Sequence, residues 1–364
     1  MSQAVIGILT WRNGTTFSEP AYLRRLVQVG RKLGATVFLF SHQDANLSKR
    51  QIYGFLPGGK GGWVRRWFPW PDIVIDRYRK RESAYIRFRH RKLFPYANST
   101  FSKKWKITKL LAEEAATSKW IPDTADYSKP QLLQMLKRYP LVYVKPGNGT
   151  GGRSILKVAA TSKGYHLLGR DKSLRMRMAR FESEKAVAAW IERWVKEQRI
   201  QNGPFMLQQG LQLSLLPQRV ADVRLLIQKN GRGCWDVTGL GVRVGSLSSS
   251  TSNLHGGGRA LAFEPFMRER FGDRMEEIRQ ECCQLALQTA ATLERHFGRM
   301  IEFGLDIGVD VDGKVWLIEV NPKPGREIFR EIGQAKTYRL AIKRPVQYAL
   351  YLATEAKRTV RLHR

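Results

Sequence analysis

The segment FGLDIGVDVDGKVWLIEVNPKPG, residues 303–325, carries the pattern that decides the fold. Asp312-Gly313 between two apolar runs is a strong signal for a two-residue hairpin turn. In a hairpin without a bulge, this turn places Asp306 directly opposite Glu319, and Asn321 follows on the same side because side chains alternate with period two. Two carboxylates in this position repel each other.

A divalent cation between the two carboxylates would remove the repulsion. Asp306, Glu319 and Asn321 offer only oxygen ligands, which suit Mg²⁺ that bridges substrate phosphates better than they suit zinc. The alternative is that both acids pair with some of the abundant arginines. The prolines of the following PKPG end the strand and leave the three side chains at its end, which favours the metal site.

Upstream, the loop VKPGNGTGGRS at residues 144–154 matches two known phosphate-binding motifs. Gly147, Gly149 and Gly152 fit a dinucleotide fingerprint, and the same stretch fits a P-loop except that Arg153 stands where that motif has lysine. Both motifs need a helix directly after the loop, yet the next residues are β-branched and show no helical period. We therefore expect a glycine loop between antiparallel strands that covers a triphosphate, with an ordinary glycine-rich hairpin as the alternative.

The rest of the chain predicts an α/β protein. A strand at 5–9, a helix that begins near Ser18 and a strand at 35–40 form a strand–helix–strand unit typical of a parallel sheet. The expected division of the chain is an N-terminal α/β domain over residues 1–100, a second domain over 101–353 with a lid lobe at about 140–210, and a basic tail at 354–364.

Together, the lysine before the glycine loop and the later Asp and Glu-x-Asn on a hairpin resemble the ATP-grasp superfamily, and more narrowly the YheC/YheD family of endospore coat-associated ATP-grasp proteins. The segments that carry the resemblance run from about residue 98 to 330: STFSKKWKITKLL, VYVKPGNGTGGRSI, FMLQQGLQL, ADVRLLIQK, GVRVGSLSSSTSNLHGGG and DIGVDVDGKVWLIEVNPKPGRE. The resemblance implies a parallel α/β pre-ATP-grasp domain followed by a two-lobed ATP-grasp fold that clamps Mg-ATP.

The resemblance also implies roles for single residues. The two nucleotide lysines match Lys104, with Lys103 as an adjacent alternative, and Lys145, and both would contact phosphate oxygens. Residues 208–211 match the hinge that binds adenine, although many ATP-grasp enzymes carry an acidic residue where this chain has two glutamines. The full ATP-binding set is Lys104, Lys145, Gly149, Gly151, Gly152, Gln208, Gln209 and Leu211.

The same resemblance assigns the metal, catalytic and substrate sites. The magnesium ligands match Asp306, Glu319 and Asn321. Arg224 and Arg243 match arginines that hold the reacting carboxylate and the transferred phosphoryl group, because guanidinium forks stabilise the charge of an acyl-phosphate transition state. A surface position is the alternative for each arginine. The substrate loop contains Asn253, His255 and Gly256.

The chain is strongly basic, with 63 Lys or Arg against 31 Asp or Glu and a net charge of +32. Residues 1–110 hold 22 of the basic residues and five of the acidic ones. On a strand, Arg87, Arg89 and Arg91 would project from one face. An acidic peptide or another polyanion is the favoured partner, nucleic acid is possible but not favoured because no known nucleic-acid module is present, and a solvated basic surface is the remaining alternative.

Composition excludes several other classes of protein. An apolar content of 43% excludes a disordered chain, and no apolar run reaches the length of a membrane span. Three cysteines without a C-x-x-C pattern favour a reduced compartment, so we expect the cytoplasm. The family resemblance implies that this is a mother-cell cytoplasm or that the protein lies in the spore coat. Because no H-R-D or D-F-G motif is present, a protein kinase is excluded.

The function that the resemblance implies is an ATP-dependent carboxylate–amine ligase that uses ATP and Mg²⁺. The alternative is a non-catalytic spore-coat or polyanion-binding protein that retains nucleotide binding.

Overall fold

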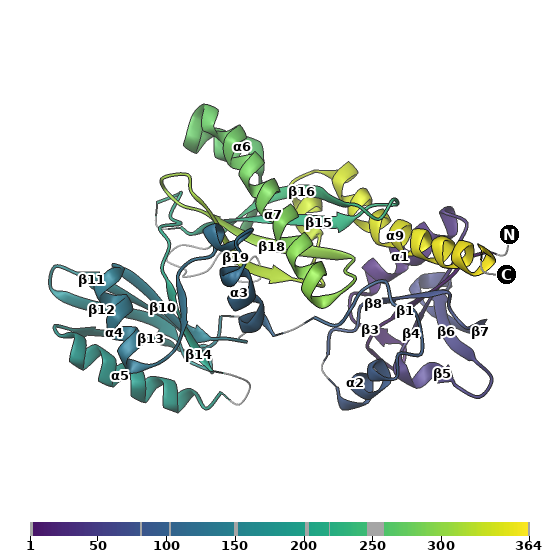
Figure 1. Ribbon diagram of the computed structural model, residues 1–364, viewed down its shortest axis with the longest axis horizontal. Helices are drawn as coiled ribbons and strands as arrows, with labels where there is room; N and C mark the ends of the chain where they lie inside the picture. Colours follow the sequence, from purple (N-terminus) through teal and green to yellow (C-terminus); the bar gives the residue numbers. More distant parts are fainter. Residues whose placement is uncertain are drawn as a thin grey trace.

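The computed structural model describes residues 3–80, 82–101, 103–148, 152–200, 204–217, 219–245 and 258–362, with side chains up to residue 356. Three sheets of five or six strands form the body of the molecule, and helices pack against each of them (Figure 1). Among the described residues, no helix has both the length and the apolar character that crossing a membrane requires.

The N-terminal sheet has the strand order β5–β6–β4–β1–β8, and β7 pairs with β6. Its strands are β1 (Val5–Leu9), β4 (Thr36–Phe40), β5 (Ala45–Asn46), β6 (Gln51–Pro57), β7 (Trp63–Pro69) and β8 (Ile73–Asp76), accompanied by the hairpin β2 (Arg12–Asn13) and β3 (Thr16–Phe17) and by the helices α1 (Pro20–Lys32) and α2 (Ser83–His90). Strand β1 pairs in parallel with both β4 and β8. Between β1 and β4, the chain forms the hairpin β2–β3 and then the helix α1. The predicted parallel strand–helix–strand unit is therefore confirmed.

The second sheet is antiparallel, in the order β13–β12–β11–β10–β14–β9. Its elements are β9 (Thr124–Asp126), β10 (Leu141–Pro146), β11 (Ile155–Thr161), β12 (Gly164–Arg170), β13 (Met176–Phe181), β14 (Phe205–Gln209), α4 (Lys129–Arg138) and α5 (Glu184–Gln198). Both helices pack on one face of the sheet and bury apolar side chains such as Leu156, Leu167 and Ile191. Strand β11 follows the glycine loop and pairs antiparallel with β10, so the helix that a dinucleotide fingerprint or a P-loop requires is not formed there.

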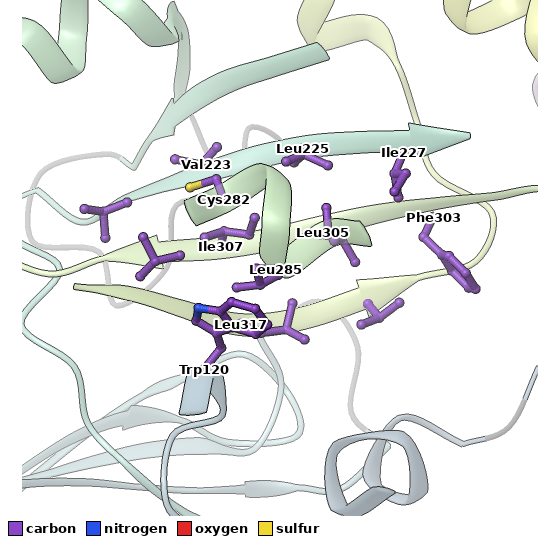
Figure 2. Packing of buried hydrophobic residues seen from close by; sticks show 14 of the residues in the cluster. Trp120, Val223, Leu225, Ile227, Cys282, Leu285, Phe303, Leu305, Ile307 and Leu317 are labelled. Carbon is purple, nitrogen blue, oxygen red and sulfur yellow. The ribbon is translucent and has the colours of Figure 1, made fainter. Parts of the chain in front are cut away.

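The third sheet, β17–β16–β15–β18–β19, is covered by helices on both faces. Its elements are β15 (Ala221–Lys229), β16 (Trp235–Val244), β17 (Arg259–Ala262), β18 (Glu302–Val309), β19 (Val315–Asn321), α3 (Lys104–Glu113), α6 (Phe263–Phe271), α7 (Met275–Phe297), α8 (Glu327–Glu331) and α9 (Ala335–Leu362). On one face, Leu225, Leu285 and Leu317 belong to a continuous core (Figure 2). On the other face, α9 packs against both β15 and α1.

The hairpin β18–β19 differs from the predicted one in its turn. Val309 pairs with Val315, and the Asp310 N–H donates to the Lys314 carbonyl, so three residues rather than two form the loop. A bulge at Ile318 then shifts the pairing back by one residue. As a result, the predicted two-residue turn is wrong, but the predicted pairing of Asp306 with Glu319 is confirmed.

One expectation about the basic segments is wrong. Residues 83–90 form helix α2 and not a strand, because Tyr85, Phe88 and Arg89 lie on one buried side at helical spacing. Arg87 and Arg91 are exposed while Arg89 is buried, so the three arginines do not share one face. The basic tail that begins at residue 354 is helical through Leu362 as part of α9.

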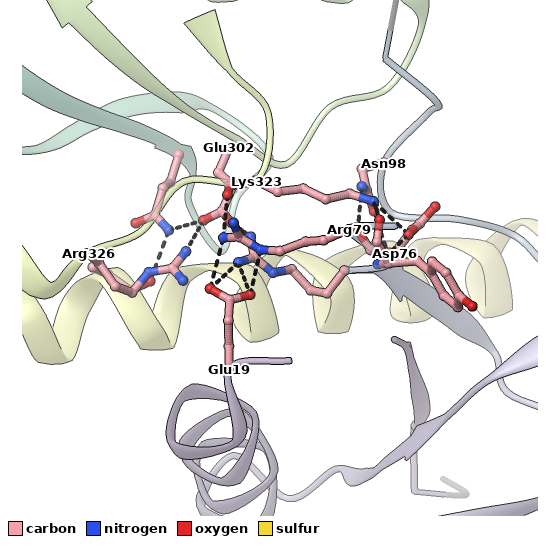
Figure 3. Close-up of polar contacts among 11 residues, drawn as sticks. Glu19, Asp76, Arg79, Asn98, Glu302, Lys323 and Arg326 are labelled. Atoms are coloured by element: carbon pink, nitrogen blue, oxygen red, sulfur yellow. Dashed lines mark hydrogen bonds and ion pairs between the residues drawn. The ribbon is translucent and has the colours of Figure 1, made fainter. Parts of the chain in front are cut away.

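A buried ionic network joins the N-terminal sheet to β18 and to the segment after β19 (Figure 3). Arg77, directly after β8, pairs with Glu302 at 2.8 Å and with Glu19 at 2.8 Å. Arg326 pairs with the other oxygen of Glu302 at 2.6 Å, and Lys323 reaches Asp76 at 2.9 Å. The network fixes the chain just beyond Asn321 against the N-terminal sheet.

Candidate functional site

A cavity of about 280 Å³ is lined by residues of both the second and the third sheets and of α3. It brings together residues from segments far apart in the sequence. The predicted site residues that line it are Lys104, Lys145, Gly152, Gln208, Gln209, Leu211, Arg243, Asp306 and Glu319.

The two predicted phosphate lysines enter the cavity from different elements. Lys145 lies near the end of β10, and its Nζ donates to Gln208 Oε1 at 2.6 Å. Burial lowers the pKa of Lys145 to about 8, an effect that Glu319 opposes and Lys104 reinforces. Lys104 begins α3 and pairs with Glu319 at 2.7 Å, whereas the neighbouring Lys103 is exposed and does not line the cavity.

The two opposed carboxylates are both in ion pairs with basic side chains. Asp306 Oδ1 accepts from Arg224 Nε at 2.7 Å, and Asp306 Oδ2 lies 3.0 Å from Arg243. Glu319 pairs with Lys104. The alternative interpretation, that both acids pair with arginines, thus holds for Asp306, whereas Glu319 pairs with a lysine.

Oxygen donors converge at this point. Asp306 and Glu319 are directly paired, and Asn321 lies two residues further along β19, opposite Gly304. A Cβ on Gly304 would lie 2.6 Å from Pro324, so glycine is required where the segment after Asn321 crosses β18. Two carboxylates and one amide oxygen fit a hard cation that takes its other ligands from phosphates and water. No group of three His, Cys, Asp or Glu arranged for a metal occurs among the described residues.

The segment after β14 presents backbone groups to the cavity. The N–H groups of Gln209 and Gly210 already donate to Asp123 and Leu141 carbonyls. Within the described part of the chain, the Leu211 N–H donates no hydrogen bond, and Leu211 lines the cavity. Gln208 is used inside the sheet, because it accepts from Lys145 and donates to Thr124.

The start of the glycine loop approaches other backbone closely. A Cβ on Gly147 would lie 2.9 Å from the Cβ of Trp105 and 3.2 Å from the Pro204 carbonyl. Gly152 has a φ of +73° and lines the cavity. Gly149 and Gly151 lie outside the described residues, as do Asn253, His255 and Gly256 of the predicted substrate loop.

Two of the remaining predicted residues stand next to the cavity. Neither lines it: Arg224 donates to Asp306, which does, and Asn321 lies two residues beyond Glu319 on β19. The sequence reasoning missed Asp222, which accepts two hydrogen bonds from Arg243 at 2.7 and 2.6 Å and lines the cavity. It also missed Tyr143 and Lys157. Tyr143 stands between two buried valines, and Lys157 stands between a buried leucine and a buried valine. This alternation was the signal in the sequence that both side chains lie on the face of the sheet opposite the core.

Comparison with known proteins identifies the type of fold and the relatives. A model of the YheC/D-like ATP-grasp family matches residues 93–352. The chain is 27% identical to the endospore coat-associated protein YheD of Bacillus subtilis over 369 residues, which cover 97% of this chain and 79% of YheD. It is 26% identical to the endospore coat-associated protein YheC of the same organism over 257 residues, covering 69% and 68% of the two chains.

Solved structures share the fold at low sequence identity. The D-cycloserine synthetase DcsG superposes with a TM-score of 0.53 at 11% identity, covering 97% of this chain and 99% of that one. The D-alanyl-alanine synthetase A of Vibrio cholerae gives 0.53 at 13% identity with 98% of both chains covered. The ATP-grasp ligase PsnB, in complex with a minimal precursor, gives 0.53 at 12% identity, covering 94% and 98%. The chain thus has the ATP-grasp fold that these ligases share.

Proposed function

The chain belongs to the YheC/D-like ATP-grasp family, and on this premise we propose that it is an ATP-dependent carboxylate–amine ligase. The observation that carries the proposal is the cavity, which gathers two lysines, the ion pair of Arg243 with Asp222, and the opposed carboxylates of Asp306 and Glu319 from distant segments. Cationic side chains and oxygen donors in one cavity suit a nucleoside triphosphate with its metal.

ATP would lie between the two sheets. The Leu211 N–H, which has no partner among the described residues, would bind the adenine ring. Lys145 and Lys104 would contact the phosphates, and the glycine loop, with Gly149, Gly151 and Gly152, would cover them. Asp306, Glu319 and Asn321 would hold Mg²⁺, which shields the phosphate oxygens from one another and from the attacking carboxylate.

In the proposed reaction, an oxygen of the substrate carboxylate attacks the γ-phosphorus of ATP. The bond between that phosphorus and the β–γ bridging oxygen breaks, and ADP leaves with the bond's electron pair. The amine then attacks the acyl carbon of the acyl phosphate. The bond between this carbon and the bridging oxygen breaks, inorganic phosphate leaves with that oxygen and the bond's electron pair, and the amine's proton passes to solvent. Arg224 and Arg243 would stabilise the charge on the transferred phosphoryl group and on the carboxylate.

The arginines are positioned in advance for this role. Arg243 is held by both oxygens of Asp222 and by Asp306, and Arg224 is held by Asp306. Their side chains are only 7% and 14% exposed, so they need little reordering during the reaction. The cost of ordering the guanidinium groups is already met when the protein folds.

For the substrate, we propose an acidic peptide or similar polyanion linked to the spore coat. The net charge of +32 supports an anionic partner. The two Bacillus subtilis relatives are named as endospore coat-associated proteins, which supports a place in or near the coat.

ADP release in a coupled assay, with panels of carboxylates and amines, tests the proposal. We expect ADP release that needs both substrates and Mg²⁺ and that falls at least a hundredfold in Arg243→Gln. ATP binding without ADP release for any substrate pair would instead support the alternative, a non-catalytic coat or polyanion-binding protein that retains the nucleotide site. The exposed Arg193 on α5 supplies a control, since Arg193→Gln makes the same change of charge away from the cavity.

A further inference from the structure

The cavity-facing side of the second sheet continues beyond the cavity. Tyr143 and Lys157, which line the cavity, pair with each other, Lys157 pairs with Leu168, and Leu168 pairs with Met178. Directly paired residues project from the same face of a sheet. Leu168 and Met178 therefore extend the cavity-facing side outward to the edge of the sheet.

Two further rows of paired residues lie on this side. Ile155 pairs with Arg170 and Arg170 with Met176, and on β12 and β13 His166 pairs with Arg180. We use the term β12–β13 face for the outer part of this side, which consists of Leu168, Arg170, Met176, Met178 and Arg180.

The β12–β13 face is not covered by the helices of its own lobe. The alternate residues of the same strands, Leu167 and Ala179, pack with apolar residues of α4 and α5 on the opposite side. Met178 is 65% exposed, more than any other large apolar side chain among the described residues, and Met176 is 53% exposed. Flexible thioether side chains on a surface adapt well to apolar side chains of a partner.

The same region is strongly basic. Residues 163–180 contain six Lys or Arg and one acid, Asp171. Asp171 is occupied within the chain, because it accepts from the Ser173 and Arg175 N–H groups and pairs with Arg177 at 2.9 Å. Arg170 and Arg180 are exposed on the β12–β13 face, so an anionic partner is favoured there.

Strand β13 is also an edge strand. It pairs with β12 alone among the described strands, so half of its backbone donors and acceptors point away from the sheet. An extended peptide can pair with such an edge and place every second side chain on the exposed face.

We propose that the β12–β13 face binds an acidic peptide in extended conformation, with apolar side chains on Met176 and Met178 and carboxylates at Arg170 and Arg180. This inference rests on the proposed ligase function, because it places a peptide substrate next to the nucleotide cavity. Single-stranded nucleic acid fits the face less well, since it binds through aromatic side chains that stack on bases, and on this side of β12 and β13 the aromatic content is limited to His166, which is half-buried.

Fluorescence anisotropy with the full-length chain and a labelled octapeptide, Glu-Leu-Glu-Leu-Glu-Glu-Glu-Glu, tests the site. The control peptide, Glu-Glu-Glu-Leu-Leu-Glu-Glu-Glu, has the same composition but places its two leucines on opposite faces of a strand. We expect the first peptide to bind at least threefold more tightly. The double variant Met176→Thr/Met178→Thr should weaken it at least fivefold, and Arg180→Gln about threefold, while the affinity for ATP stays within twofold.

The matched control is Arg193→Gln, which changes the same charge on α5, on the opposite side of the sheet. Three outcomes would overturn the site. One is that Arg193→Gln and Arg180→Gln weaken peptide binding equally, and another is that the two peptides bind with equal affinity. The third is that a single-stranded oligonucleotide binds more tightly than the peptide and that the Met variant loses this binding too. Far-ultraviolet circular dichroism and ATP affinity show whether each variant is folded.

The outcome separates the docking site from the proposed function. If the wild-type chain binds the peptide in the expected way but never releases ADP, the site stands and the ligase function falls. If ADP release depends on the peptide and its KM is unchanged in the Met and Arg180 variants, the ligase function stands and the site falls.

Discussion

At the scale of single residues, the two opposed carboxylates are held in different ways. Asp306 is 8% exposed and shared between Arg224 and Arg243. The Glu319 and Lys104 side chains are 34% and 36% exposed. Removing one charge from a buried pair leaves the partner unpaired and costs several kcal/mol, whereas exposed pairs contribute little.

We therefore expect two similar substitutions to differ in their effect on stability. Asp306→Asn should lower the free energy of unfolding by about 1–3 kcal/mol. The decrease is smaller than for an arginine left without any partner, because Arg243 still pairs with Asp222. Glu319→Gln should change it by less than about 1 kcal/mol. Both variants should lose the part of ATP binding that depends on Mg²⁺. Denaturant unfolding and ATP titration with and without Mg²⁺ measure these effects, and an unchanged Mg²⁺ dependence in Glu319→Gln would rule out the metal site.

A second expectation at this scale concerns pH. Burial lowers the pKa of Lys145 to about 8, and bound phosphates would raise it again, so the protonated lysine is the form that binds ATP. A group with a pKa near 8 is about nine-tenths protonated at pH 7 and about one-tenth at pH 9. ATP affinity should fall roughly tenfold between pH 7 and pH 9.

Calorimetric titration of ATP across this range checks the expectation. Lys145→Arg provides the comparison, because a guanidinium stays charged throughout the range. Its ATP affinity should be nearly constant with pH, even if it is lower overall. The same slope in Lys145→Arg and the wild-type chain would show that another group is responsible.

Residue patterns predicted the local part of the site better than the distant part. Asp306 and Glu319 are linked by a short hairpin, so alternation and the turn signal brought them together in the prediction, although the pairing holds only because the bulge at Ile318 offsets the longer loop. Lys145 and Gln208 lie instead on β10 and β14, which β11, β12 and β13 separate in the sequence. No local rule specifies that such distant strands become neighbours, so this contact could not be predicted.

At the scale of elements, α2 shows how period two and period 3.6 can be confused. Arg87, Arg89 and Arg91 alternate, which suggested a strand, but burial follows the helical spacing of Tyr85, Phe88 and Arg89. The short run of eight residues fits both patterns. The Asp76 carboxylate favours the helix over the strand, because it accepts from Arg89 Nε at 3.0 Å and from the Tyr85 hydroxyl at 2.6 Å.

The helix makes a specific prediction about stability. Arg89 is 8% exposed, donates to the Asn98 carbonyl at 2.6 Å and stacks on Tyr96. Arg89→Gln should lower the free energy of unfolding by about 3–5 kcal/mol, because it leaves Asp76 with one partner fewer in a buried site. Arg87→Gln/Arg91→Gln should change it by less than about 0.5 kcal/mol. Thermal and denaturant unfolding compare the two, and similar losses would contradict the burial of Arg89.

The hairpin shows a compensation that sequence rules do not include. The three-residue loop moved the register by one, and the bulge at Ile318 moved it back before Glu319. A turn signal fixes the presence of a hairpin, but a bulge depends on packing around the strand. Here Ile318 lines the cavity, so the bulge lies at the site itself.

At the scale of the whole molecule, the parallel N-terminal unit and the ATP-grasp fold were predicted, but the way in which they join was not. The C-terminal helix α9 contributes Ala341, Ile342 and Val346 to the same core as Leu23 and Leu26 of α1. This contact spans more than three hundred residues of sequence. The apolar pattern of α9 predicts that one side is buried but does not say against what.

The distribution of charge leads to the last prediction. Residues 1–110 carry 22 Lys or Arg and five acids, and the structure leaves Arg87 and Arg91 exposed there. Such a field attracts an anionic partner over distances that salt screens within about 8–10 Å. Mg-ATP, in contrast, would be held by short contacts inside the cavity.

Binding of a long acidic polypeptide, such as polyglutamate, should therefore weaken at least tenfold between about 50 and 200 mM salt, while ATP affinity changes less than about threefold. Arg87→Gln/Arg91→Gln should flatten the salt dependence of polyglutamate binding and leave ATP binding unchanged. Arg89 is excluded from this variant because its charge is buried against Asp76. Titrations of polyglutamate, of ATP and of a single-stranded oligonucleotide at each salt concentration decide the matter. Parallel losses for polyglutamate and ATP would mean that the N-terminal charge acts on the nucleotide site itself, and no loss for any anion would show that this surface is only solvated.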